Sequence, residues 1–67
     1  MKIILNNRLE NFKADSLSIS EIIKQKNFTF KLLVTKINGG LIKKENRDTA
    51  FVKDGDTVLI LHLISGG

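Results

Sequence analysis

The sequence has 67 residues, which is enough for one small domain with a single core, because chains of this size bury only a modest share of their surface. With 42% hydrophobic and 27% charged residues, the composition is that of a globular protein and excludes a disordered segment. Cysteine is absent, which excludes disulfides, thiolate nucleophiles and zinc–thiolate sites.

The net charge of +4 and the isoelectric point of about 9.7 raise the question of nucleic-acid binding. The basic residues are spread along the chain, and in the densest group, Lys43, Lys44 and Arg47, Glu45 and Asp48 dilute the charge. No aromatic residue interleaves with that group to stack on bases. We therefore expect no nucleic-acid partner and favour a solvated basic surface, or one that steers the protein toward an acidic partner.

No targeting or membrane segment is predicted. The apolar start meets polar Asn6 and Asn7 too soon for a signal peptide. The longest apolar run, 58–61, is too short to cross a bilayer. A cytoplasmic protein without membrane contact is the expectation.

The first half of the chain predicts a hairpin followed by a short helix. Residues 2–6 and 9–14 read as two strands joined by an asparagine turn. Residues 18–21 (Ser-Ile-Ser-Glu) form a capping-box pattern, in which Ser18 and Glu21 act as a helix cap. The helix that follows has about two turns and stops at Asn27, and one of its faces carries Ile19, Ile22 and Ile23.

The second half predicts mainly strands and turns. In chain order these are an alternating segment 28–31, a strand 32–37, a tight turn 38–40, a short edge strand 41–43, a polar loop 44–50, a return to the core at 51–52, a turn 54–56 and the strongest strand, 57–64. One short helix covers only one face of a sheet, so the fold class is α+β.

The last strand is apolar on both faces. Val58, Ile60 and His62 lie on one face, and Thr57, Leu59, Leu61 and Leu63 on the other. A strand covered by a single helix should alternate apolar and polar residues. Either loops wrap the second face, or it is a docking patch. We favour a partner-binding patch made of Leu59, Leu61 and Leu63.

The residues after this strand are Ser65, Gly66 and Gly67. A frayed glycine end is common and usually without function, but its place directly after a long apolar strand favours a working tail. A terminal carboxylate is ionised at pH 7 and is a poor electrophile. ATP can convert it to an acyl-adenylate, from which a sulfur donor displaces AMP to give a thiocarboxylate. Residues without Cβ let such a tail thread a narrow channel.

The whole chain resembles the ThiS-type sulfur carriers of thiamine biosynthesis, which belong to the ubiquitin-like β-grasp proteins. The segments that carry the resemblance are 3–6, 18–23, 33–38, 52–56 and 63–67. The resemblance implies a β-grasp fold, in which one helix packs across one face of a mixed sheet of four to five strands. The first and last strands should lie parallel and adjacent, in a single domain over 1–67 with a flexible tail at 65–67.

The resemblance also implies a carrier rather than an enzyme. A ubiquitin-activating-like adenylyltransferase of the ThiF type would adenylate Gly67 with ATP and magnesium. A persulfide on a partner would supply sulfur, and the thiocarboxylate would donate it to a thiazole synthase of the ThiG type. Ser65 and Gly66 would complete the tail motif, and the chain itself would hold no metal or cofactor. A ubiquitin-like modifier, a molybdopterin-type carrier and a plain binding module stay open as alternatives.

The chain departs from the family at Lys43-Lys44, where many relatives have Pro-Arg, and at Arg47, where many have an aromatic residue. These departures concern the choice of partner and not the fold. His62 is expected to pack within its strand, and the sequence at 54–56 (Asp-Gly-Asp) to form a turn, because a calcium loop needs a longer ligand series. The predicted core residues are Ile3, Leu5, Ile19, Ile22, Ile23, Val34, Val58 and Ile60, together with Phe28, Phe30 and Phe51.

Overall fold

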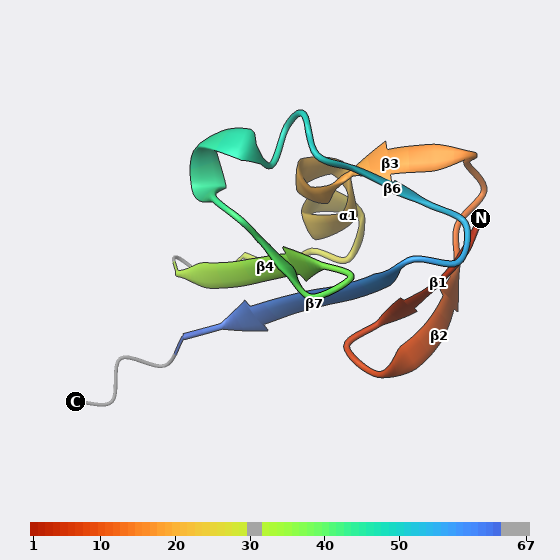
Figure 1. The fold of residues 1–67 in the computed structure, drawn as a ribbon, viewed down its shortest axis with the longest axis horizontal. Coiled ribbons are helices and arrows are strands. Elements are labelled where there is room, and N and C mark those ends of the chain that lie inside the picture. The colour runs from red at the N-terminus through yellow and green to blue at the C-terminus, as the bar shows by residue number, and fades with distance from the viewer. Residues whose placement is uncertain (30–31, 64–67) are drawn as a thin grey trace.

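The computed structural model describes residues 1–29 and 32–63, which form a mixed sheet with one α-helix and a two-stranded ribbon on one side of it (Figure 1). The five strands of the sheet have the order β2-β1-β7-β4-β5. In chain order the elements are β1 (Lys2–Leu5), β2 (Arg8–Asn11), β3 (Ser16–Ser18), α1 (Ile19–Gln25), β4 (Leu33–Ile37), β5 (Gly40–Ile42), the 3₁₀ helix η1 (Lys44–Asn46), β6 (Phe51–Lys53) and β7 (Thr57–His62).

Two tight hairpins supply the outer pairs of strands. Asn6 and Asn7 join β1 to β2 with φ of 52° and 67°, and Asn38 and Gly39 join β4 to β5 with φ of 49° and 84°. Positive φ at both central residues is the geometry of a type I′ turn, which matches the twist of the flanking strands. The return strand ends at Asn11, earlier than predicted, and the next residue, Phe12, is buried in the core.

The helix has the predicted cap and length. The Glu21 N–H donates to Ser18 Oγ at 3.1 Å, and the Ser18 N–H donates to Glu21 Oε1 at 3.2 Å, which completes the capping box. The helix ends at Gln25, and Asn27 follows with φ of 57°. The N–H of Phe28 then donates to the carbonyl of Ile23, so the end of the helix is a Schellman motif with asparagine in the left-handed position.

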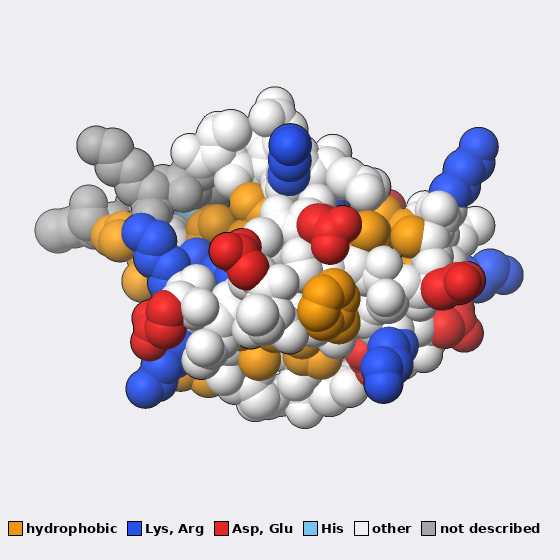
Figure 2. Space-filling view, turned by 90° about the horizontal axis from the view of Figure 1, so that it is seen from above, with side chains coloured by type: hydrophobic (Ala, Val, Ile, Leu, Met, Phe, Trp, Pro, Cys, Tyr) orange, Lys and Arg blue, Asp and Glu red, His pale blue; other side chains and the backbone are white. Residues whose placement is uncertain are grey.

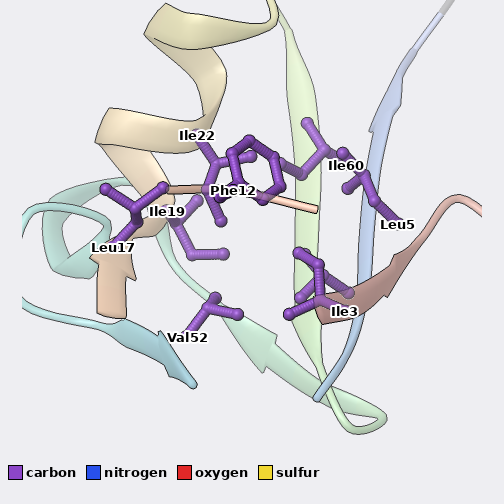
Figure 3. Packing of buried hydrophobic residues seen from close by; sticks show 9 residues of the cluster. Ile3, Leu5, Phe12, Leu17, Ile19, Ile22, Val52 and Ile60 are labelled. Atoms are coloured by element: carbon purple, nitrogen blue, oxygen red, sulfur yellow. The ribbon is translucent and has the colours of Figure 1, made fainter. Parts of the chain in front are cut away.

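The core lies between the sheet and the layer of α1, β3 and β6. Figure 3 shows Leu17, Ile19, Ile22 and Val52 facing side chains of the sheet. Of the predicted core residues, Ile3, Leu5, Ile19, Ile22, Val58 and Ile60 are buried, and Ile23 and Phe28 are half-buried against them. Val52, in the predicted return to the core at 51–52, is also buried, whereas the sequence analysis missed the buried residues Phe12 and Leu17.

Two core predictions were wrong, and one cannot be judged. Val34 lies on the opposite face of β4 from the buried Thr35, because neighbouring residues of a strand point to opposite faces. Phe51 is 52% exposed, since its neighbour Val52 takes the inward position on β6. Phe30 lies outside the described residues.

The β3–β6 ribbon is the element that the sequence analysis did not predict. It pairs Leu17 with Val52, and both side chains are buried. Each strand has three residues, which is too short to show a period in the sequence. The ribbon fixes the start of the helix, because β3 leads directly into α1 and the Ile19 N–H donates to the carbonyl of Ala50 at 3.0 Å.

Candidate functional site

The strand that leads to the tail, β7, is the central strand of the sheet. It pairs in parallel with β1 through Leu5 and Val58, and antiparallel with β4 from Ile37 opposite Val58 to Leu33 opposite His62. Its β-branched residues suit a strand with neighbours on both sides. The predicted parallel pairing of the first and last strands is therefore confirmed, and Figure 1 shows β7 pointing away from the end of the molecule that carries the N-terminus.

Two asparagine side chains hold β7 in register. Asn6 Nδ2 donates to the carbonyl of Ile60 at 3.0 Å, while the Ile60 N–H donates to Asn6 Oδ1 at 2.8 Å. The Asn6 amide thus continues the β1–β7 pairing where β1 has ended. At the start of β7, the Thr57 N–H donates to Asn38 Oδ1 at 2.8 Å. Both side chains come from turns, so the hairpins position the strand that carries the candidate site.

The two faces of β7 have different surroundings. Val58 and Ile60 point into the core and are buried, whereas Leu59 is half-buried and Leu61 is 50% exposed on the opposite face. Within the described residues, no helix or strand covers that opposite face. The two strands beside β7 add further partly exposed apolar side chains there, namely Ile4, opposite Thr57, and Val34, opposite Leu61.

The three leucines of the predicted docking patch follow this open face to its end. Leu63, after the last residue of β7, is 57% exposed, and its N–H donates to the carbonyl of Leu32 at 3.0 Å. The chain is thus held beside β4 as far as Leu63. Partner binding by Leu59, Leu61 and Leu63 stays a prediction. The tail residues Ser65, Gly66 and Gly67, and Ile64 of the predicted strand, lie outside the described residues.

The prediction for His62 was wrong. Its side chain is exposed, although the alternation of β7 gives it the same face as Val58 and Ile60. The buried core reaches Ile60 and extends no further along β7. The end of the strand is therefore accessible on both faces, immediately before the tail.

A shallow groove opens beside the open face, between β4, β5 and η1. Arg47 crosses it, with Nη2 donating to the carbonyl of Leu33 at 2.6 Å and Nε donating to Thr35 Oγ1 at 3.1 Å. This contact exists because β5 pairs only with residues 35–37 of β4, so the edge of β4 at Leu33 meets a side chain and not a strand. The groove is lined by Leu32, Leu33, Val34, Thr35, Leu41, Ile42, Lys43, Lys44 and Arg47.

The sequence analysis missed this groove, because it treated 44–50 as a polar loop. The departures from the family that it noted, Lys43, Lys44 and Arg47, are all among the lining residues. They come together because η1 folds the chain back toward the start of β4. In the sequence, the only indication of the groove was that these three residues differ from those of many family members.

The turn before β7 is a structural turn, as predicted. Gly55 has φ of 88°, and the Asp56 carboxylate accepts from the Lys53 N–H at 2.8 Å and from Asn38 Nδ2 at 3.0 Å. These hydrogen bonds, the one from Lys53 foremost, lower the pKa of Asp56 from its usual value of 3.8. In residues 1–29 and 32–63, no set of three His, Asp or Glu side chains is placed to ligate a metal, and no helix there has the length and apolar character needed to span a membrane.

Comparison with known proteins gives a consistent result. The model of the ThiS family matches residues 3–67. The crystal structure of a thiamine biosynthesis protein (ThiS) from Geobacter metallireducens has a TM-score of 0.89 and 28% identity, with 100% of both chains covered. A solution structure of a thiamine biosynthesis protein from the same organism has a TM-score of 0.80 and 28% identity, covering 100% of this chain and 88% of the other. No curated sequence matches the chain. The mixed sheet with one helix is the ubiquitin-like β-grasp fold that the sequence predicted.

Proposed function

Because the chain belongs to the ThiS family, we propose that it carries sulfur for thiamine biosynthesis and acts as a carrier, not as an enzyme. The observation that carries this proposal is the family match, which runs through the fold and the tail alike, from residue 3 to residue 67. The structural likeness to the Geobacter protein supports it over the full length of both chains.

The group that we propose is modified is the carboxylate of Gly67. ATP, with magnesium, converts the carboxylate to an acyl-adenylate and releases pyrophosphate. The terminal sulfur of a persulfide then attacks the carbonyl carbon, and AMP leaves. Reduction of the remaining sulfur–sulfur bond by a thiol frees the thiocarboxylate. Gly66 and Gly67 have no side chain to obstruct this carbonyl, and Ser65 precedes them in the sequence.

The partners that we propose are an adenylyltransferase of the ThiF type, a persulfide-bearing sulfur donor and a thiazole synthase of the ThiG type. An enzyme that admits the tail must also contact the end of β7, since residue 63 is still held beside β4. The leucines of the open face lie at this place and provide apolar contact area. ATP and magnesium belong to the activating enzyme, and a cytoplasmic location stays a prediction.

Intact-mass measurement tests this proposal. The protein is incubated with its activating enzyme, ATP, magnesium and a persulfide donor, and then fragmented. We expect a species in which sulfur replaces one oxygen, localised to Gly67. Isopeptide-linked adducts in cell extract, without that species, would instead favour a ubiquitin-like modifier. If Gly67 stays an unmodified carboxylate and deletion of Gly66 and Gly67 leaves the cells unaffected, the chain is a plain binding module.

A further inference from the structure

The ionisable residues that line the groove between β4, β5 and η1 are cationic, although carboxylates lie nearby. In the sequence, Glu45 and Asp48 interrupt the basic group of Lys43, Lys44 and Arg47. In the fold, Asp48 accepts a hydrogen bond from the Ser20 hydroxyl on the helix side and does not line the groove. Glu45 is exposed on η1 and does not line it either. The ionisable residues of the groove are therefore all cationic.

Within residues 1–29 and 32–63, no carboxylate forms an ion pair with these cations. Within the described residues, the single ion pair joins Lys26 to Glu10, and neither residue lines the groove. Arg47 donates to a carbonyl and a hydroxyl, which are both neutral acceptors. Lys43 and Lys44 are exposed. Figure 2 shows Lys and Arg side chains gathered at the end of the molecule where η1 lies in Figure 1, with an acidic group between them.

The floor of the groove is apolar. Leu32 is 55% exposed and Leu41 is 62% exposed, and Val34 lies between them on β4. The volume of about 260 Å³ lies below the range of roughly 300–1,000 Å³ that is usual for small-molecule pockets. The groove is therefore smaller than a usual small-molecule pocket, and its size suits one or two side chains of a partner.

From this arrangement we infer that the groove is a docking site for an acidic, leucine-rich segment of a partner protein. Aliphatic side chains of the segment occupy the floor, and its carboxylates meet Lys43 and Lys44. This inference deepens the proposed function and rests on it. The Leu63 N–H, close to the tail, donates to the carbonyl of Leu32, which lines the groove. A protein that binds the tail therefore also lies within reach of the groove. The cations of the groove would favour acidic partners, in addition to the apolar contact that the open face provides.

Other occupants fit less well. A second copy of the chain carries a net charge of +4 and is repelled. Nucleic acid gains little from a floor of leucines, since binding of single strands depends on aromatic stacking. A protein segment with both aliphatic and acidic side chains can contact the apolar residues of the groove and pair with its lysines at the same time.

Titration with a synthetic peptide tests the inference. The probe is a short fluorescent peptide of alternating leucine and glutamate, and its matched control carries glutamine in place of glutamate. Binding to the intact protein is followed by fluorescence anisotropy and by amide chemical shifts. The test variant is Lys43→Ala/Lys44→Ala, and the control variant is Lys13→Ala/Lys24→Ala, which removes the same charge from exposed positions outside the groove.

We expect the glutamate peptide to shift the amide signals of Val34, Leu41 and Lys43. Its Kd should rise about tenfold in the groove variant and stay unchanged in the control variant. The inference is overturned if the glutamine peptide binds as tightly, if both double variants lose affinity equally, if the shifts lie elsewhere, or if duplex DNA binds the groove more tightly than the peptide. These readouts need no sulfur chemistry, so they can fail while the mass measurement on Gly67 succeeds, and the reverse.

Discussion

Single asparagine residues set much of the local geometry of this protein. Asn6, Asn7, Asn27 and Asn38 all have positive φ, which asparagine tolerates better than other residues with a side chain. The positions of Asn27 and Asn38 could be predicted from the sequence, because a helix end and a turn are local features. The bond from Asn6 to Ile60 could not, since it joins residues 54 apart.

Asp56 should contribute to stability in a pH-dependent way. Its pKa is lowered in the folded protein, so its contribution is present above the usual value of 3.8 and is lost as the pH falls through the lowered pKa. We expect Asp56→Asn to reduce the free energy of unfolding by about 1 kcal/mol at pH 7. The difference in the free energy of unfolding between wild type and Asp56→Asn should shrink as the pH falls from 3.8 through the lowered pKa of Asp56.

Urea denaturation at neutral and acidic pH measures the effect. Asp15→Asn, at an exposed position, is the control and should match wild type at both values. A difference between Asp56→Asn and wild type that is the same at acidic pH would show that the charge of Asp56 is not the cause.

At Gly67, we expect substitution by alanine to leave folding unchanged and to slow adenylation. The added methyl group lies beside the carbonyl carbon that must be attacked. A loss of about tenfold in rate corresponds to ~1.4 kcal/mol in the activation barrier. Circular dichroism checks the fold, and pyrophosphate release checks the rate. An unchanged rate would contradict the proposed steric role of the glycine.

At the scale of secondary structure, the helix depends on its cap. Ser18 is 3% exposed and makes both bonds of the capping box. We expect Ser18→Ala to lower the free energy of unfolding by about 1 kcal/mol. Ser16→Ala, at an exposed position of the same strand, should cost much less. Thermal unfolding of both variants compares them, and equal midpoints would show that the cap is dispensable.

The elements that could be predicted from the sequence are those with a clear period or a local signal. The helix shows an isoleucine face and a capping box, and β7 has a long apolar run. The β3–β6 ribbon has neither signal, and its two strands are distant in the sequence and pair only in the folded protein. Phe51 illustrates the limit, because in a strand of three residues nothing in the sequence shows whether Phe51 or Val52 points inward.

At the scale of the whole molecule, the sheet has one covered face and, as far as the described residues show, one open face. The prediction of an exposed apolar face followed from counting helices, since one helix cannot cover both sides of a sheet. The groove could not be predicted in this way. Its lining by Lys43, Lys44 and Arg47 depends on how η1 folds back toward β4, while Asp48 accepts a hydrogen bond from Ser20 and does not line the groove. Adjacency in the sequence does not indicate which of these residues line it.

The open face provides a test of the docking patch. Leu61→Thr keeps a strand-forming residue and removes apolar area at a position that is 50% exposed. We expect a change in stability of less than about 1 kcal/mol, and adenylation by the activating enzyme that is slower by about tenfold. Leu9→Thr, at a position that is 69% exposed on β2, is the matched control and should be activated normally. Normal activation of both variants would remove Leu61 from the patch.

The central position of β7 also links folding to the synthesis of this strand, which follows all the other strands in the chain. In the strand order β2-β1-β7-β4-β5, the hairpins β1–β2 and β4–β5 do not pair with each other. Only β7, which pairs with both β1 and β4, joins them into one sheet. A ribosome-bound chain that lacks β7 has the pairs β1–β2, β4–β5 and β3–β6 but no strand that joins them into the five-stranded sheet, and isolated hairpins are barely stable in water. Leu59 and Leu61 belong to the same late strand, so the surface that we propose for the activating enzyme forms only when the sheet closes. We expect unfinished or truncated chains to be ignored by that enzyme, because the fold itself acts as a checkpoint before activation.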